Sequence, residues 1–135
     1  MNLEVEIINK QKIAIDKLLK ASLSDTYQRF GPNRSAWVEV LITDNEEIKI
    51  LNRDYRGKDQ PTDVLSFPVS IDSQLGQVVP DNEVLALGTI VISFEQAEQQ
   101  VGRFGKDLNN ELIGLAQHGL RHLLGHTHDN QGNWQ

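Results

Sequence analysis

The chain of 135 residues contains no cysteine. Disulfide bonds and thiolate metal sites are therefore excluded, and the composition suits a reducing compartment. No apolar run approaches the roughly 18 residues that a membrane-spanning helix needs. The first residues, MNLEVEIINK, lack the basic-then-apolar pattern of a signal peptide. We therefore expect a cytoplasmic protein with no membrane partner.

Aromatic side chains and positive charge are also scarce. Aromatic residues make up 6% of the chain, so we do not expect an extensive surface for stacking nucleobases. The 13 Lys and Arg residues are outnumbered by 19 Asp and Glu residues, which gives a net charge of −6. Proteins that coat nucleic acid usually carry the opposite sign, and no DNA partner is expected. A local basic channel for RNA stays compatible, because phosphate contacts depend on the local field.

The remaining composition is that of a globular domain. Hydrophobic residues make up 39% of the chain and charged residues 24%. No internal repeat or low-complexity segment divides the sequence, and the length is sufficient for one buried core. Residues 1–135 are therefore predicted to form a single domain.

Four segments have the pattern of β-strands. Leu3, Val5 and Ile7 alternate with acidic residues, which is the period of a half-buried strand. The other three strands are expected at residues 36–42, Val64 to Pro68 and Leu87 to Ser93. Residues 70–86 are predicted to be a surface loop, because they are rich in polar and turn-forming residues without clear periodicity.

Helices are predicted between the strands. Apolar residues recur at helical spacing from about Lys10 to Phe30, among them Leu18 and Leu19, and Gly31-Pro32 ends that helix. Thr43 or Asp44 can cap a short helix that includes Tyr55. Further helices are expected from Ser93, as N-cap, to about Phe104, and from about Asn109 to Leu124, with Gly125 as its stop. We predict a compact α+β fold, with a mixed four-stranded sheet, covering helices and a metal site at the end of the last helix.

All four histidines lie in one short motif, HGLRHLLGHTH, from His118 to His128. His118 and His122 are four residues apart, so their imidazoles project from one face of a helix. Gly125 lets the chain turn back, and His128 can then return as a third ligand. Three imidazoles with an open fourth position are typical of a catalytic zinc site. We therefore expect one Zn²⁺ on these three histidines, with water or substrate as the fourth ligand.

Other interpretations of the histidines stay open. They could be surface or core side chains clustered by accident, or they could hold a purely structural metal. Nickel or another divalent ion with affinity for imidazole could replace zinc. His126 is expected to be exposed to solvent, and Asp129 could orient a ligand histidine.

The spacing is similar to the metzincin protease signature H-E-x-x-H-x-x-G-x-x-H, with one difference. The glutamate of that signature is the general base of peptide hydrolysis. Gly119 stands in its place here. Proteolysis by that mechanism is therefore disfavoured.

With glycine at that position, the motif resembles the YbeY family of bacterial rRNA maturation factors, whose hallmark is similar to H-G-x-L-H-L-x-G-Y-D-H. Two further blocks resemble the family in the same order: YRGKDQPTDVLSFP from Tyr55 and LGTIVIS from Leu87. The resemblance extends from about Val38 to His128. It departs from the family at Arg121 and His126, and at Thr89 and Thr127, where the family usually has Asp. Loss of these two carboxylates is expected to weaken metal binding if they orient ligands.

The resemblance implies a zinc-dependent, single-strand-specific endoribonuclease, a hydrolase that acts in rRNA maturation and ribosome quality control. It implies that His118, His122 and His128 are the metal ligands and that Arg56 is the catalytic arginine. A fixed guanidinium there would stabilise the negative charge of a phosphodiester transition state. Lys58 and Arg53 could extend a phosphate-binding surface, although ordinary solvation is the simpler interpretation.

A binding module is the alternative. In that interpretation the metal is mainly structural, and the protein binds small-subunit ribosomal proteins or an assembly GTPase. The acidic composition would suit basic ribosomal proteins.

Overall fold

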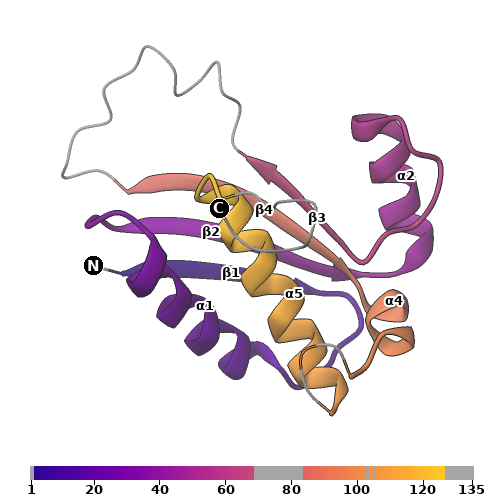
Figure 1. The fold of residues 1–135 in the computed structure, drawn as a ribbon, viewed down its shortest axis with the longest axis horizontal. Coiled ribbons are helices and arrows are strands. Elements are labelled where there is room, and N and C mark those ends of the chain that lie inside the picture. The colour runs from indigo at the N-terminus through magenta and orange to yellow at the C-terminus, as the bar shows by residue number, and fades with distance from the viewer. Residues whose placement is uncertain (1, 69–83, 103, 105, 127–135) are drawn as a thin grey trace.

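The computed structural model describes residues 2–68, 84–102, 104 and 106–126. These residues form helices packed on a four-stranded sheet (Figure 1). In chain order the elements are β1 (Leu3–Asn9), α1 (Asp16–Phe30), β2 (Ala36–Thr43), α2 (Asn45–Arg56), β3 (Val64–Pro68), β4 (Leu85–Ser93), α4 (Phe94–Gln99) and α5 (Leu108–Leu123). The predicted α+β fold with a mixed four-stranded sheet is confirmed.

The sheet has the strand order β1-β2-β4-β3. The first three of these strands run parallel, and β3 pairs antiparallel with β4 at the edge. Gly88 in β4 has a φ of +138° and approaches β3 so closely that a Cβ atom there would lie 2.1 Å from the carbonyl oxygen of Phe67. Only glycine fits this position.

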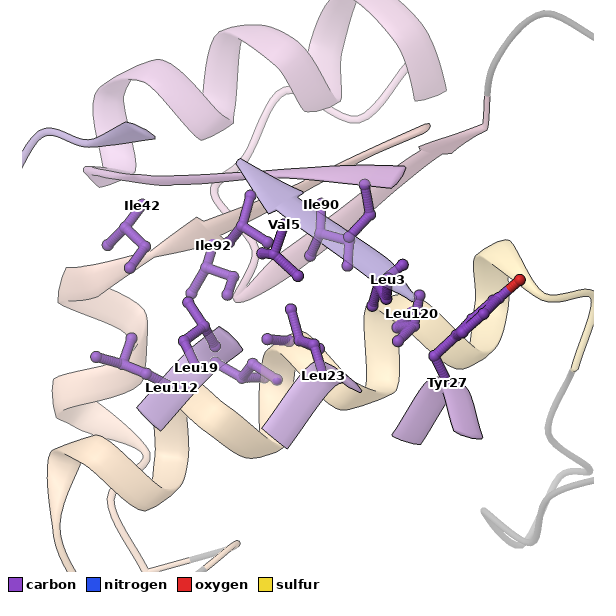
Figure 2. Close-up of a cluster of buried hydrophobic side chains, with 14 of the residues drawn as sticks. Leu3, Val5, Leu19, Leu23, Tyr27, Ile42, Ile90, Ile92, Leu112 and Leu120 are labelled. Atoms are coloured by element: carbon purple, nitrogen blue, oxygen red, sulfur yellow. The ribbon is translucent and has the colours of Figure 1, made fainter. Parts of the chain in front are cut away.

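The larger core lies between one face of the sheet and the helices α1 and α5. Leu19, Leu23 and Tyr27 recur every four residues along α1 and form one buried ridge. They pack with Ile90 and Ile92 of β4 and with the buried face of α5 (Figure 2). The two helices therefore lie side by side over the same face of the sheet (Figure 1).

A smaller core covers the opposite face of the sheet. Ile48 of α2 packs there against Leu65 and Val91. Neighbouring residues of β4 thus point to different layers, because successive side chains of a strand alternate between its faces. α2 is thereby held against β4, and its last turn reaches the edge formed by β3.

Three predicted boundaries were wrong. α1 begins at Asp16 rather than near Lys10, because the side chain of Asn9 bonds both the N–H and the carbonyl of Ile13 and holds that segment as a turn. α4 ends at Gln99 rather than Phe104, and Gly102 in the turn that follows has a φ of +120°. Leu85 and Ala86 belong to β4 rather than to a loop, because they pair with β2.

Leu18 is also placed differently from the prediction. Its side chain is 51% exposed, although it shares the apolar spacing of α1. The ridge through Leu19 and Leu23 faces the sheet, so its neighbour Leu18 points away from the core.

Within the described ranges, no helix is both long and apolar enough to cross a bilayer.

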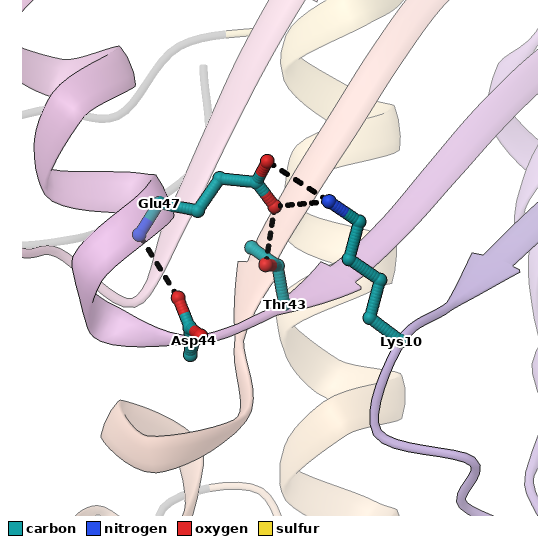
Figure 3. A network of polar contacts seen from close by, with 4 residues as sticks. All are labelled: Lys10, Thr43, Asp44 and Glu47. Carbon is teal, nitrogen blue, oxygen red and sulfur yellow. Dashed lines mark hydrogen bonds and ion pairs between the residues drawn. The ribbon is translucent and has the colours of Figure 1, made fainter.

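Capping residues and one ion pair fix the start of α2. The Asp44 carboxylate accepts a hydrogen bond of 2.9 Å from the N–H of Glu47, as a helix N-cap does. The Glu47 carboxylate in turn accepts hydrogen bonds from the Thr43 hydroxyl and from the Lys10 ammonium, which lies 2.9 Å away (Figure 3). The residue that follows β1 is thereby joined to the first turn of α2.

The Glu47 network should make stability depend on pH. The Thr43 hydroxyl and then Lys10 lower the pKa of Glu47 in the folded protein. A lowered pKa stabilises the fold above the unfolded value of about 4.3, and this contribution is lost as pH falls through the folded value. Glu47→Gln should therefore cost up to about 1 kcal/mol at neutral pH and less at acidic pH, because the pair is partly exposed. Urea unfolding at several pH values measures this, with Glu46→Gln as the exposed control, and equal losses at neutral and acidic pH would contradict it.

Candidate active site

The contact of α5 with strands β3 and β4 sets the position of the histidines. Gly119 faces the sheet so closely that a Cβ atom there would lie 2.7 Å from Cγ2 of Ile90. The Ser66 hydroxyl donates a hydrogen bond of 3.1 Å to the Gly119 carbonyl. There is consequently no space at this position for a glutamate side chain. The glycine that replaces the metzincin base is thus required by packing.

His118 and His122 converge, as their spacing predicts. Their Nε2 atoms are 3.0 Å apart, and their ring centroids are 4.7 Å apart. Two ligand nitrogens bound to one tetrahedral zinc ion would be about 3.3 Å apart. The two imidazoles are therefore already close to the separation that a shared metal ion requires.

The turn after α5 fixes the orientation of the His122 ring. Gly125 adopts a φ of +93°, its N–H donates to the carbonyl of His122, and the N–H of His126 donates to the carbonyl of Arg121. This Schellman motif brings the His126 carbonyl to 3.1 Å from Nδ1 of His122. A carbonyl only accepts, so Nδ1 carries the hydrogen and Nε2 keeps its lone pair.

Arg121 contacts the same turn through His126. Its Nε donates a hydrogen bond of 3.0 Å to Nδ1 of His126, and its guanidinium lies 4.0 Å from the centroid of the Phe30 ring. The Phe30 ring also meets the His126 ring edge to face, at 5.6 Å. His126 is therefore partly buried against α1, and the prediction that it is exposed was wrong.

The described residues include two of the three predicted metal ligands. His128, like Thr127 and Asp129, lies outside the described residues. Among those that are described, no group of three potential ligands occurs. The pair that is described nevertheless fits a metal, because two Nε2 atoms converge and one of them is oriented by a carbonyl, as ligand histidines usually are.

A cleft of about 490 Å³ brings the histidine pair together with Arg56. Its lining comes from the last turn of α2, from β3 and the residue before it, and from α5. The lining residues are Tyr55, Arg56, Asp63, Val64, Ser66, Phe67, His118 and His122. The predicted catalytic arginine and two predicted ligands thus share one cavity, although the arginine is more than 60 residues away from either histidine in the chain.

Backbone contacts hold the segment that carries Arg56. Arg56 is the last residue of α2 rather than the first residue after it, and Gly57 follows in the left-handed conformation with a φ of +71°. The buried side chain of Asn52 donates a hydrogen bond of 2.9 Å to the carbonyl of Gln60. The chain therefore turns sharply after Arg56 and returns to the helix, and Arg56 lines the cleft.

Other polar candidates are placed around or outside the cleft. The Asp63 carboxylate accepts a hydrogen bond of 2.7 Å from the N–H of Val64, as expected for a residue at a strand start. Arg53 pairs with Asp54, whose hydrogen bond raises the pKa of the arginine. Neither Arg53 nor Lys58 is among the lining residues.

Thr89 does not act on the histidines. Its hydroxyl lies 3.4 Å from a Glu39 carboxylate oxygen, and it neighbours Ile90, the residue that points to α5. Because strand side chains alternate, Thr89 faces the other side of the sheet. The expectation that this position bears on ligand orientation was wrong.

Two aromatic residues line the cleft, although the sequence did not identify them as site residues. Tyr55 was expected only as part of a short helix. Phe67, in the predicted strand, packs partly against the smaller core. Tyr55 is 71% exposed, and its ring meets the Phe67 ring at 5.2 Å between centroids, at 64°. β3 lies at the edge of the sheet, so one side of this strand has no neighbouring strand. This edge position would have identified Tyr55 and Phe67 as residues of the cleft.

The chain is similar to known proteins. The profile of the family described as "Endoribonuclease YbeY" matches residues 2–135. The chain is 38% identical over 136 residues to an endoribonuclease YbeY of Dehalococcoides mccartyi, with coverage of 94% of this chain and 82% of the relative. It is 41% identical over 128 residues to that of Carboxydothermus hydrogenoformans, with coverage of 91% and 82%.

A solved structure shares the fold. The solution structure of a Thermotoga maritima protein is similar, with a TM-score of 0.57 and 28% identity, over 93% of this chain and 75% of that chain. The fold and the paired histidines define the class, an α+β domain with two converging imidazoles in a cleft beside the edge strand. The chain belongs to the endoribonuclease YbeY family.

The tight contact at Gly119 predicts an unusual response to alanine. Gly→Ala inside an unhindered helix should stabilise by roughly 1 kcal/mol. Gly119→Ala should instead destabilise by about 1–3 kcal/mol, because the new methyl group meets Ile90 and the Ser66 hydroxyl. Thermal unfolding measures this. Gly119→Ala/Ile90→Ala, which removes both Cγ atoms that the new methyl group meets, should cost less than the sum of the two single changes. A raised Tm in the single variant would contradict the contact.

Proposed function

We propose that this protein is a zinc-dependent endoribonuclease that cleaves single-stranded RNA in the cytoplasm, in rRNA maturation and ribosome quality control. The observation that carries the proposal is the single cleft that contains Arg56, His118 and His122. Family membership supports it, because the relatives are named endoribonucleases. His128 is the proposed third ligand.

The chemistry of phosphodiester hydrolysis fits the residues of the cleft. The transition state carries additional negative charge on the phosphoryl oxygens, and a fixed guanidinium stabilises it. Arg56 is exposed at the mouth of the cleft and can donate two parallel hydrogen bonds to a phosphate. A bound zinc ion would supply Lewis acidity and activate water at neutral pH. The His122 ring would be held ready for it by the His126 carbonyl.

The aromatic pair beside the cleft favours a single-stranded substrate. Proteins recognise unpaired RNA mainly by stacking its bases on aromatic side chains. Tyr55 is mostly exposed and is supported from the side by Phe67. A base next to the phosphate at Arg56 could stack there, whereas bases inside a duplex are not accessible to such a ring.

A protease is disfavoured by the same geometry. The general base of the metzincin mechanism would have to occupy position 119, where even a methyl group meets Ile90. A ribosome-associated binding module with a structural metal is the remaining alternative, and the cleavage experiment below separates it from the enzyme.

The first experiment is cleavage of a labelled single-stranded RNA by purified protein, with and without chelator. We expect cleavage that chelation abolishes and zinc restores. His122→Ala, purified in parallel, should be inactive and identifies contaminating ribonuclease. Cleavage that survives both controls would be contamination. No cleavage by metal-loaded wild-type protein would overturn the proposal in favour of the binding module.

The roles of His122 and Arg56 can be separated. His122→Ala should lose bound metal, whereas Arg56→Ala should keep it and lower kcat/KM by about a hundredfold, as for loss of one donor to a transition-state oxyanion. Arg53→Ala is the matched control, because Arg53 lies one turn earlier on the same helix and outside the lining of the cleft. Elemental analysis and RNA cleavage measure the two effects. Loss of zinc from the Arg56 variant would contradict this division of roles.

Arg121 should act on the metal through His126. Arg121→Leu, which introduces the residue usual in the family, removes the hydrogen bond to His126 and the contact with Phe30. Zinc affinity should fall by about tenfold, as when partners that orient a ligand are removed. Competition with a chromogenic chelator measures this, with the Tm of the metal-free variant as a separate readout of folding. Unchanged zinc affinity would show that the turn holds His122 without Arg121.

A further inference from the structure

A second groove lies on the other side of α5. It has a volume of about 310 Å³ and is formed by α1, α5 and the segment before α5. Its lining residues are Thr26, Arg29, Phe30, Phe104, Gly114, Gln117, His118 and Arg121. His118 lines both this groove and the cleft that contains Arg56. The two hollows therefore adjoin at a proposed metal ligand.

The charge of this groove differs from that of the other hollows. Among the described residues, its lining includes two arginines and no carboxylate. Asp63 lines the cleft of Arg56, Asp16 lines the hollow beside the start of α1, and Asp44 is one of three acidic residues in the hollow beside α2. In a chain with a net charge of −6, two arginines in the described lining of one groove favour a local positive field.

Both guanidiniums of the groove gather around one ring. Arg121 and Arg29 lie 4.0 Å and 5.2 Å from the centroid of Phe30. Stacking holds each planar group by cation–π attraction, and the exposed Arg29 guanidinium can still donate hydrogen bonds from its edge. Both positive charges would attract an anion that enters the groove.

An aromatic face is also present. Phe104 packs across Gly114 of α5, where a Cβ atom would lie 2.1 Å from its ring, yet 40% of the side chain is exposed. Guanidiniums beside an exposed aromatic ring are typical of sites for single-stranded nucleic acid. The guanidiniums bind the phosphate, and the ring stacks on the base.

We propose that the groove between α1 and α5 is a second RNA subsite, which holds a nucleotide that flanks the phosphodiester bound at Arg56. Arg29 and Arg121 bind its phosphate, and Phe104 stacks on its base. The RNA strand then crosses α5 at His118, so that the nucleotides before and after this crossing lie in different hollows. This inference rests on the proposed nuclease function, and it assigns the groove to single-stranded RNA.

Binding of a fluorescently labelled single-stranded RNA to metal-free protein tests the subsite without cleavage. Arg29→Gln should weaken binding by roughly three- to tenfold and reduce the slope of log Kd against log salt by about one, as for one lost phosphate contact. Arg29→Lys should keep the salt slope and recover part of the affinity. Arg121 is not used, because it also holds His126.

Lys20→Gln is the matched control. Lys20 is an exposed cation on the same helix and lines neither hollow. Its affinity and salt slope should equal those of wild type. If Arg29→Gln and Lys20→Gln bind alike, the subsite is wrong, even if cleavage at Arg56 stands. If wild-type protein binds no RNA, the proposed function fails together with the inference.

Cleavage kinetics give a second readout. With metal-loaded protein and an RNA long enough to span both hollows, Arg29→Gln should raise KM and leave kcat within about twofold, because uniform binding is lost. With a dinucleotide, whose single phosphate cannot occupy both hollows, the variant and wild type should be equal. A fall in kcat on both substrates would place Arg29 in the chemistry or the fold and overturn its assignment to a flanking subsite.

Discussion

The close approach of α5 to the sheet at Gly119 is the constraint on which the site depends. With no side chain at this position, Ile90 and the Ser66 hydroxyl reach the helix, and the Gly119 carbonyl accepts the Ser66 hydrogen bond. His118 precedes this contact by one residue and His122 follows it by three, so the helix presents both imidazoles beside β3. Because β3 is an edge strand, the space next to it stays open and becomes the cleft. The same packing contact between α5 and the sheet therefore builds the core and places His118 and His122 beside β3.

Local patterns predicted most of the fold and half of the site. The periodicity of α1, the caps at Asp44 and Ser93 and the stop at Gly125 are decided by neighbouring residues, and each was confirmed. Where the prediction was wrong, a contact distant in sequence, or one that side-chain periodicity does not encode, decided the outcome. Leu85 and Ala86 form a strand because β2 supplies partners, and Tyr55 is exposed because of the edge strand beside it. His126 is covered because α1 supplies Phe30. No pattern within ten residues of these positions contains that information.

The same geometry limits how this scaffold can change its reaction. A metzincin-like base needs a carboxylate one residue after the first histidine, but that residue lies against the sheet. Glutamate at position 119 would require a smaller residue at Ile90 and a shift of the helix, which would also displace the two ligands. Single substitutions therefore cannot reach peptide hydrolysis by this route. Changes at Arg121 and His126 are less costly, because they act at the surface between α1 and α5.

The contact between Phe30 and Arg121 joins the first helix to the last one. Domains fold from the N-terminus during synthesis, yet α5 has to pack against α1 and β3 before any histidine is oriented. A growing chain contains Arg56 and the complete sheet well before it contains His122. The cleft therefore forms only after α5 has been synthesised. An incomplete chain that ends before α5 therefore contains Arg56 but cannot form the cleft in which Arg56 and the histidine pair meet.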